Sequence, residues 1–101
     1  MSEKEEREHL ARVKALPCWI RNHECGGEIE AHHLTDGGRR LGHYYTIPLC
    51  HYHHHWDSPL PIGQAYHKGT KPWVKNHGDQ MEMRNEVMQE LYGDEPWPES
   101  K

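Results

Sequence analysis

Side chains that could bind a metal ion are concentrated in one stretch of the chain. Residues 28–56, EIEAHHLTDGGRRLGHYYTIPLCHYHHHW, contain seven of the eleven histidines and one of the three cysteines. Imidazole and thiolate groups are the usual protein ligands of zinc, and a neutral imidazole can also accept a proton near neutral pH. The stretch therefore predicts a structural metal site, a catalytic one, or both.

Three cysteines and one histidine have a spacing that fits a structural zinc site. Six residues separate Cys18 from Cys25, and two separate Cys50 from His53. Two ligands on a loop and two on a helical turn could close a tetrahedral Cys3His site. The alternative places Cys18 in a small core beside Trp19 and leaves the other two cysteines as free thiols. We favour zinc because the composition offers little else that would fix the loop PCWIRNHECGG.

A second group of histidines could combine a metal ion with a base. Alternation along a strand sends His32 and His33 to opposite sides, so that one could bind a metal while the other accepts a proton. His54 follows His53 and lies about 100° further round a helix, so it faces away from the zinc site. Hydrolysis of a phosphodiester uses both groups: a metal ion stabilises charge on the phosphate, and a neutral imidazole takes a proton from the attacking water.

The composition limits the fold and the location of the protein. The chain has 101 residues, of which 34% are hydrophobic, with no Phe and a mean hydropathy of −1.11. We therefore expect one domain with a thin core that needs a metal staple. Three cysteines cannot all pair, and the opening MSEKEEREHL has no signal-peptide pattern, so we expect reduced thiols and a cytoplasmic protein. No apolar run reaches the roughly 18 residues that would cross a bilayer, so no membrane partner is expected.

The net charge of −4 is unevenly distributed. Residues 79–101 hold seven acidic and two basic residues, whereas residues 17–78 hold five and six. Binding to nucleic acid normally needs an excess of Lys and Arg, but bound divalent cations would add positive charge to the middle segment. The sequence is therefore compatible with a DNA partner.

Local patterns predict a helix at the start of the chain and a hairpin in the middle. Residues 2–15 are helix formers, with Ser2 as the N-cap, but they carry few apolar side chains, so we expect a solvated helix. Residues 28–34 and 43–49 have the alternation and the β-branched and aromatic content of paired strands, joined by TDGGRRLG as a turn with a basic tip. A brief helix is expected from Cys50.

Two further helices are expected downstream. Thr70 should cap the first, which ends at Gly78, and Asp79 should begin the second, which ends at Gly93. The apolar face of the second helix is predicted to consist of Met81, Val87, Met88 and Leu91. Residues 94–101, DEPWPESK, are expected to be disordered.

Three short motifs, AHHL, TIPLC and CHYHHH, resemble those of the ββα-metal (HNH) nucleases, in which a hairpin carries a histidine pair and a following helix carries the remaining ligands. A closer resemblance, over Cys18 to Tyr92, is to the phage recombination-enhancement, RecA-dependent nucleases of the Ref-like type. HHLTDGGRRLGHYYTIPLCHYHHH resembles that family's His-His pair, Gly-rich basic turn, Pro-Leu-Cys and terminal histidines. AYHKGTKPWVKNHG resembles the segment that carries a further metal-binding histidine.

The resemblance implies an α+β fold: a small zinc-stapled ββα-metal (HNH/His-Me finger) core with flanking helices. Residues 1–16 would form an N-terminal helical extension, residues 17–93 the nuclease domain and residues 94–101 the disordered tail. His33 would be the general base. The ligands of a catalytic divalent cation, Zn²⁺, Mg²⁺ or Mn²⁺, would be His32, His54 and His67.

Several assignments stay open at this point. His32 could be an exposed strand residue, His67 a loop histidine, and His55 could exchange roles with His54. The family's Asn near the second strand is absent here, because Tyr45 and Thr46 stand in its place, so His43 or a backbone carbonyl would orient the base. The residues predicted to contact DNA are Arg39, Arg40, His43 and His55. His51 is left unassigned. The histidines expected to be ordinary surface residues are His9, His23 and His77.

Together with the resemblance, the sequence predicts a metal-dependent endonuclease that hydrolyses phosphodiester bonds in DNA, in phage recombination or DNA processing. The resemblance implies products with a 5′-phosphate and a 3′-hydroxyl, and a location in the host cytoplasm if a phage encodes the protein. The resemblance implies a RecA-type recombinase filament as a partner. Such a partner would supply target recognition, for which so short a chain has little surface. The first alternative is a non-catalytic zinc module that binds nucleic acid or a protein, but it gives the His32–His33 pair no purpose. The second is a metal-buffering protein, which would tolerate rearranged histidines.

Overall fold

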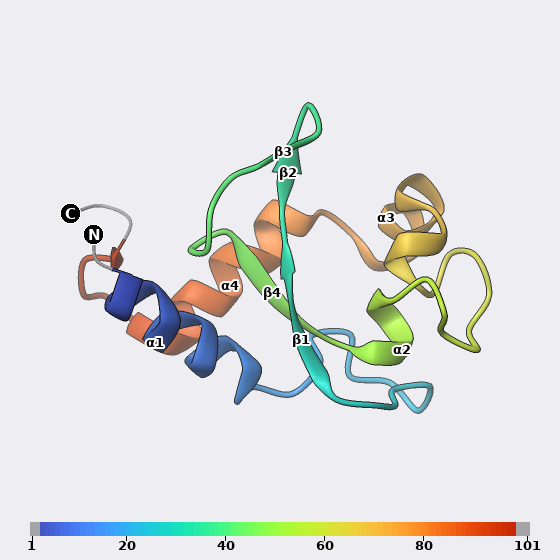
Figure 1. The fold of residues 1–101 in the computed structure, drawn as a ribbon, viewed down its shortest axis with the longest axis horizontal. Helices are drawn as coiled ribbons and strands as arrows, with labels where there is room; N and C mark the ends of the chain where they lie inside the picture. Colours follow the sequence, from blue (N-terminus) through green and yellow to red (C-terminus); the bar gives the residue numbers. More distant parts are fainter. Residues whose placement is uncertain (1–2, 99–101) are drawn as a thin grey trace.

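An antiparallel hairpin lies at the centre of the computed structural model, which describes residues 3–98. Its two strands are β1 (Ile29–His33) and β4 (Thr46–Cys50), paired as the sequence predicts. α1 (Glu3–Lys14) contacts both strands, and α4 (Gln80–Tyr92) packs across β4 (Figure 1). The hairpin is therefore held between helices from the two ends of the chain.

The remaining helices lie at the opposite end of the molecule from α1 (Figure 1). α2 (His51–His54) follows β4 directly and is the brief helix expected from Cys50. A 3₁₀ turn, η1 (Tyr66–Lys68), leads into α3 (Thr70–His77). Together these elements give a small α+β fold built on two-stranded hairpins.

A second, smaller hairpin projects from the body of the protein at the predicted basic turn (Figure 1). It pairs β2 (Thr35–Asp36) with β3 (Arg39–Arg40). Gly37 and Gly38 connect them with φ angles of +59° and +83°. A two-residue hairpin loop of this kind needs positive φ at both central positions, which glycine adopts without a steric cost.

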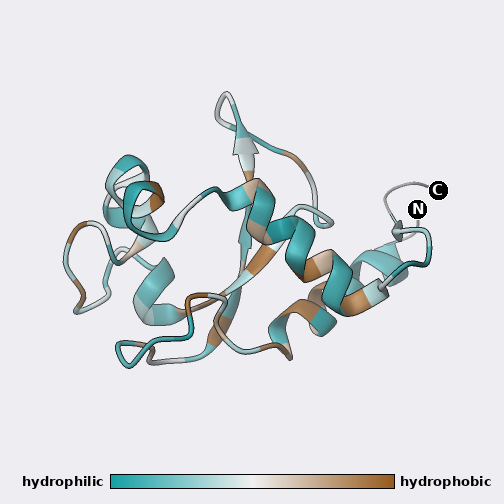
Figure 2. Ribbon diagram, turned by 180° about the vertical axis from the view of Figure 1, so that it is seen from behind, coloured by the Kyte–Doolittle hydropathy of each residue, from teal (hydrophilic) through white to brown (hydrophobic). Residues whose placement is uncertain are grey.

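The core is small, as the composition predicted. Hydrophilic positions dominate the ribbon, and hydrophobic ones occur in short patches on the strands and helices (Figure 2). The hydrophobic side chains with no exposed surface are Val13, Ile47, Leu49, Ala65, Trp73, Val87 and Met88. Among the described residues, no helix is long and apolar enough to cross a membrane.

The first helix is not simply solvated, and the prediction that His9 lies on the surface is wrong. His9 and Val13 are buried on one face of α1, as expected for residues four apart. Nδ1 of His9 lies 2.6 Å from the hydroxyl of Tyr92 in α4, and its ring contacts Tyr44. A polar side chain can be buried at little cost when it has a hydrogen-bond partner. The sequence around His9 did not indicate that it has one. Ser2, the predicted N-cap, lies outside the described residues.

The last helix begins as predicted, because the side chain of Asp79 accepts a hydrogen bond from the backbone N–H of Glu82. Of its predicted apolar face, Val87 and Met88 are buried, and the other two members are partly buried against the core. The sequence missed Arg84, which is 4% exposed. Its guanidinium lies over the rings of Tyr45 and Trp97, and its Nε donates to the carbonyl of Tyr44.

Two details of the C-terminal half differ from or extend the expectations. Gly69, and not Thr70, is the N-cap of α3, and no side chain caps this helix. Within the segment expected to be disordered, residues 94–98 are described, and the indole of Trp97 donates to the carbonyl of Gly93. The last three positions of that segment lie outside the described residues.

Candidate active site and structural metal centre

Three thiols and one imidazole converge where the loop after α1 meets the start of α2. Cys18 and Cys25 come from the loop, Cys50 ends β4, and His53 lies one turn later on α2. Nδ1 of His53 lies 3.2 Å from Sγ of Cys50, 3.6 Å from that of Cys25 and 3.8 Å from that of Cys18. The spacing in the sequence predicted this group of four, and the fold brings all four together.

The geometry of this cluster fits zinc. In tetrahedral zinc sites, metal–ligand distances of about 2.3 Å to sulfur and 2.0 Å to nitrogen place S and N about 3.5 Å apart, which is the range seen around His53. None of the three cysteines forms a disulfide. Burial raises the pKa of the Cys18 thiol to about 12, so a bound cation is what would make it a thiolate. The cluster could therefore bind a structural zinc ion.

The loop that carries Cys18 and Cys25 is fitted closely around α2. A Cβ atom on Gly26 would lie only 2.4 Å from the ring of Tyr52, so only glycine fits there. His77, predicted to be an ordinary surface histidine, is half-buried and packs against the ring of His53. These contacts fix the cluster from both sides.

A second cluster brings together His32 from β1, His54 from α2 and His67 from η1. Each offers a ring nitrogen, and the three nitrogens lie within 4.8 Å of one another. Nε2 of His54 and Nε2 of His67 are 3.2 Å apart. His32 is 2% exposed, so it is not an exposed strand residue.

Two polar side chains orient these imidazoles. Oε1 of Gln80 lies 2.8 Å from Nε2 of His32, and Oε1 of Glu30 lies 2.7 Å from Nδ1 of His54. In metal sites, such a partner on one ring nitrogen fixes the ring and leaves the other nitrogen for the ion. Burial lowers the pKa of all three imidazoles, that of His32 to about 3. The rings are therefore neutral at neutral pH, which is the form that binds metals.

His33 lies beside this cluster, at the end of β1. A cleft of about 160 Å³ is lined by both histidines of the pair, together with Arg40, His54, Tyr66 and His67. Strand alternation predicted opposite sides for His32 and His33, and the first is indeed buried while the second is half-exposed, yet both reach the cleft. Burial, and then the charge of Arg40, lowers the pKa of His33, so its ring is neutral at neutral pH.

His43 contacts His33; the sequence left open whether His43 or a backbone carbonyl would do so. Nδ1 of His43 lies 2.9 Å from Nε2 of His33, and His33 also bonds to the backbone of Ala31. Thr46, one of the two residues in place of the family's Asn, is buried and donates its hydroxyl to the carbonyl of His43. Both candidate groups therefore contact the ring of His33.

Of the other three residues predicted to contact DNA, only Arg40 is among those that line the cleft. Arg40 lines it, whereas Arg39 is exposed on the tip of the small hairpin. His55 points elsewhere, and its Nδ1 lies 2.8 Å from Oδ1 of Asp57. The amine of Lys68, a further basic group of this region, donates to the carbonyls of Ser58 and Leu60.

Sequence reasoning missed Glu30 and Gln80. Glu30 could have been found, because it lies two residues before His32 and therefore on the same face of the strand. Gln80 had no such signal, since it is 48 residues away from His32 in the sequence.

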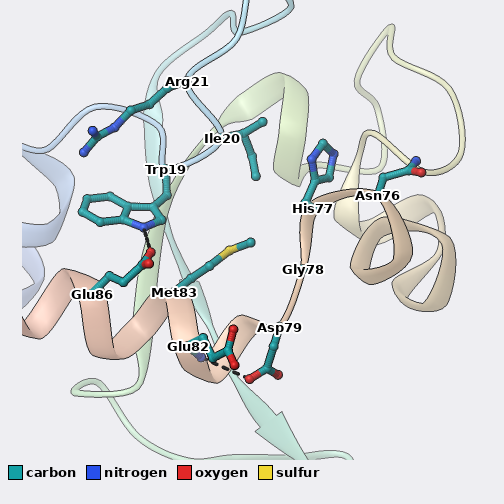
Figure 3. Close-up of a pocket in the computed structure, with 10 residues that line it drawn as sticks. All are labelled: Trp19, Ile20, Arg21, Asn76, His77, Gly78, Asp79, Glu82, Met83 and Glu86. Atoms are coloured by element: carbon teal, nitrogen blue, oxygen red, sulfur yellow. Dashed lines mark hydrogen bonds between the residues drawn. The ribbon is translucent and has the colours of Figure 1, made fainter.

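A larger hollow lies elsewhere, between the loop after α1 and the start of α4 (Figure 3). It has a volume of about 470 Å³ and contains none of the clustered ligands. The indole of Trp19 donates to Glu86 across it, and Asp79 and Glu82 add two more acidic groups (Figure 3). Such a wall would repel a phosphate backbone.

The fold and its clusters define a small α+β protein with a Cys3His group suited to zinc and a separate group of three histidines. The family model described as "Recombination enhancement, RecA-dependent nuclease" matches residues 2–96. The chain belongs to this family, whose description names a nuclease and its dependence on RecA. No curated protein and no solved structure gives a significant match to the chain.

Proposed function

We propose that this chain is an HNH-type (ββα-metal) endonuclease that hydrolyses phosphodiester bonds in DNA. The observation that carries the proposal is the position of His33, a neutral imidazole that shares one cleft with a cluster of three potential metal ligands. The hairpin carries the histidine pair on β1, and the helix that follows it, α2, carries His54. The resemblance to HNH nucleases implies this order of elements. Family membership supports nuclease activity and a DNA substrate.

In this proposal, His32, His54 and His67 would hold a divalent cation, and the ion would supply positive charge to offset the negative charge on the scissile phosphate and the leaving oxygen. Three imidazoles favour Zn²⁺ or Mn²⁺ over Mg²⁺, which prefers oxygen ligands. Gln80 and Glu30 hold two of the rings in place.

His33 accepts the proton of the attacking water, because its lowered pKa keeps it neutral at working pH. His43 and the backbone of Ala31 orient its ring. Arg40, at the edge of the cleft, binds a phosphate oxygen beside the reacting bond. The products would be a 5′-phosphate and a 3′-hydroxyl.

The Cys3His group has a structural role in this proposal. It joins the loop after α1 to α2, and α2 carries His54. A zinc ion there would therefore fix the helix that supplies one catalytic ligand.

The DNA target would be supplied largely by a RecA-type recombinase filament. The dependence on RecA is part of the family's description. Near the cleft, the exposed basic groups are few, chiefly Arg39 and Arg40, and so small a basic surface supports little sequence-specific binding.

The test is a cleavage assay on duplex, single-stranded and branched DNA, with Zn²⁺, Mn²⁺ or Mg²⁺, in the presence and absence of a recombinase filament. We expect metal-dependent cleavage that is strongest on DNA held in the filament. If no DNA form is cut under any of these conditions while the protein still binds the filament or DNA, the protein is a binding module and the proposal is wrong.

A further inference from the structure

A third group of potential metal ligands lies outside both clusters described above. It consists of His51 at the start of α2, His55 just after its end, and Asp57 in the following turn. One ligand atom from each residue lies within 4.8 Å of the other two. Neither the structural group of four nor the proposed catalytic site uses any of these side chains.

The donor atoms of this group lie close together, because both imidazoles are hydrogen-bonded to one oxygen of Asp57. Oδ1 of Asp57 lies 2.6 Å from Nε2 of His51 and 2.8 Å from Nδ1 of His55. The two imidazoles are four residues apart, one helical turn, and stack with their centroids 4.7 Å apart and their planes at 17°. Two imidazole nitrogens and one carboxylate oxygen are a ligand set that suits zinc, nickel or cobalt.

The backbone that carries these side chains is fixed by its own bonds. The N–H of His55 donates to the carbonyl of His51, and that of Ser58 donates to the carbonyl of His55. Ser58 is buried, its hydroxyl donates to the carbonyl of Tyr52, and its own carbonyl accepts from Lys68. The turn that presents Asp57 is therefore held in place without a ligand.

A carboxylate on the other ring nitrogen also orients His51. Oε2 of Glu30 lies 2.9 Å from Nδ1 of His51, which leaves Nε2 facing Asp57. This is the arrangement by which an outer carboxylate fixes a metal-binding histidine. The other oxygen of Glu30 contacts His54, so one carboxylate supports both histidine groups.

We propose that His51, His55 and Asp57 form a third metal site, for a divalent first-row transition metal such as Zn²⁺, Ni²⁺ or Co²⁺. Three protein ligands leave one position of a tetrahedral ion open to water or an anion. The side chains are 31%, 35% and 49% exposed, so the ion exchanges readily with solvent. This third site would bind its ion whether or not the protein is a nuclease.

The third site is separate from the histidine cluster of the cleft. The carboxylate of Glu30 lies between His51 of the third site and His54 of the cleft cluster, and it contacts both rings. They therefore do not act as a two-metal centre, whose ions lie about 4 Å apart.

The experiment counts Zn²⁺ bound per chain by equilibrium dialysis and elemental analysis, and follows the imidazole nitrogens by NMR during the titration. The variants are His55→Ala and Asp57→Ala, which lie on the surface and leave Glu30 untouched. The matched control is His23→Ala, which removes an exposed histidine outside every cluster.

We expect the unmodified protein and His23→Ala to bind one equivalent more than either of the other variants, with the ring signals of His51 and His55 moving during the last part of the titration. Each variant should weaken this binding by more than the roughly 10- to 100-fold that removal of an outer partner costs. Equal stoichiometry and affinity in all four proteins, or ring signals of His51 that stay fixed when zinc is in excess, would overturn the proposal.

Discussion

Nε2 of His33, at the end of β1, lies 2.9 Å from Nδ1 of His43, in the segment between β3 and β4. One imidazole therefore holds another that lines the cleft. If His33 is the base, His43 acts through it as a positioning residue, since it contacts the base and is not among the residues that line the cleft.

Replacing His43 with Ala should lower kcat by roughly 10- to 100-fold, the scale for removing a partner that orients a functional histidine. Bound metal should be unchanged, because His43 belongs to no ligand cluster. His43→Gln, which keeps a hydrogen-bonding group, should recover part of the lost rate. Steady-state kinetics beside metal analysis makes the comparison, and a loss of metal in His43→Ala would contradict the assignment.

The two arginines of the small hairpin should differ in their effect on the pH profile. His33 acts as a base only when neutral, so the rate rises as the pH rises through its pKa. Arg40 lowers that pKa; without its charge the pKa rises, and the acidic limb of the profile moves to higher pH. Arg39→Ala, the control, should leave the limb in place. Equal shifts in both variants, or a shift to lower pH in Arg40→Ala, would remove Arg40 from the site.

The same hairpin should contribute to DNA affinity. Replacing both Arg39 and Arg40 with Ala should weaken binding and make it less sensitive to salt, by about one unit of slope for each phosphate that an arginine no longer neutralises. The fold should survive, because both side chains are exposed on a two-residue strand. Unchanged affinity and slope, measured at several salt concentrations, would place the DNA-facing surface elsewhere.

The Cys3His group should retain metal more tightly than any other site in the protein. A closed site with four protein ligands has no open position, so one zinc equivalent should remain after mild chelation. Cys25→Ser and Cys50→Ser should unfold or aggregate, because metal binding and folding are coupled in so small a core. Thermal unfolding with zinc analysis tests this, with His23→Ala as the control. Loss of all metal with the fold intact would show that the group is not a structural site.

The parts of the fold that could be predicted are those with local signals. The hairpin with its glycine turn and the short helix after Cys50 follow from residues adjacent in the sequence. The Cys3His group could also be predicted, because thiols have few other uses in a reduced, thin-cored chain.

Long-range polar contacts could not be predicted. Burial of His9 depends on Tyr92, 83 residues later, and the orientation of His32 depends on Gln80. A buried polar side chain is stable only with its partner, and no local pattern identifies a partner so distant. Gln80, which orients one candidate ligand, was therefore a part of the site that no local pattern could identify.

The most direct test of the central claim compares His33→Ala with His32→Ala, measuring cleavage, DNA affinity and bound metal in the same preparations. We expect His33→Ala to lose roughly 10²- to 10⁴-fold in cleavage rate, the contribution of a general base, with metal content and DNA affinity near normal. His32→Ala should lose the metal of the histidine cluster as well as cleavage, because it removes a ligand. Equal loss of metal in the two variants, or cleavage by His33→Ala at the normal rate, would contradict the account.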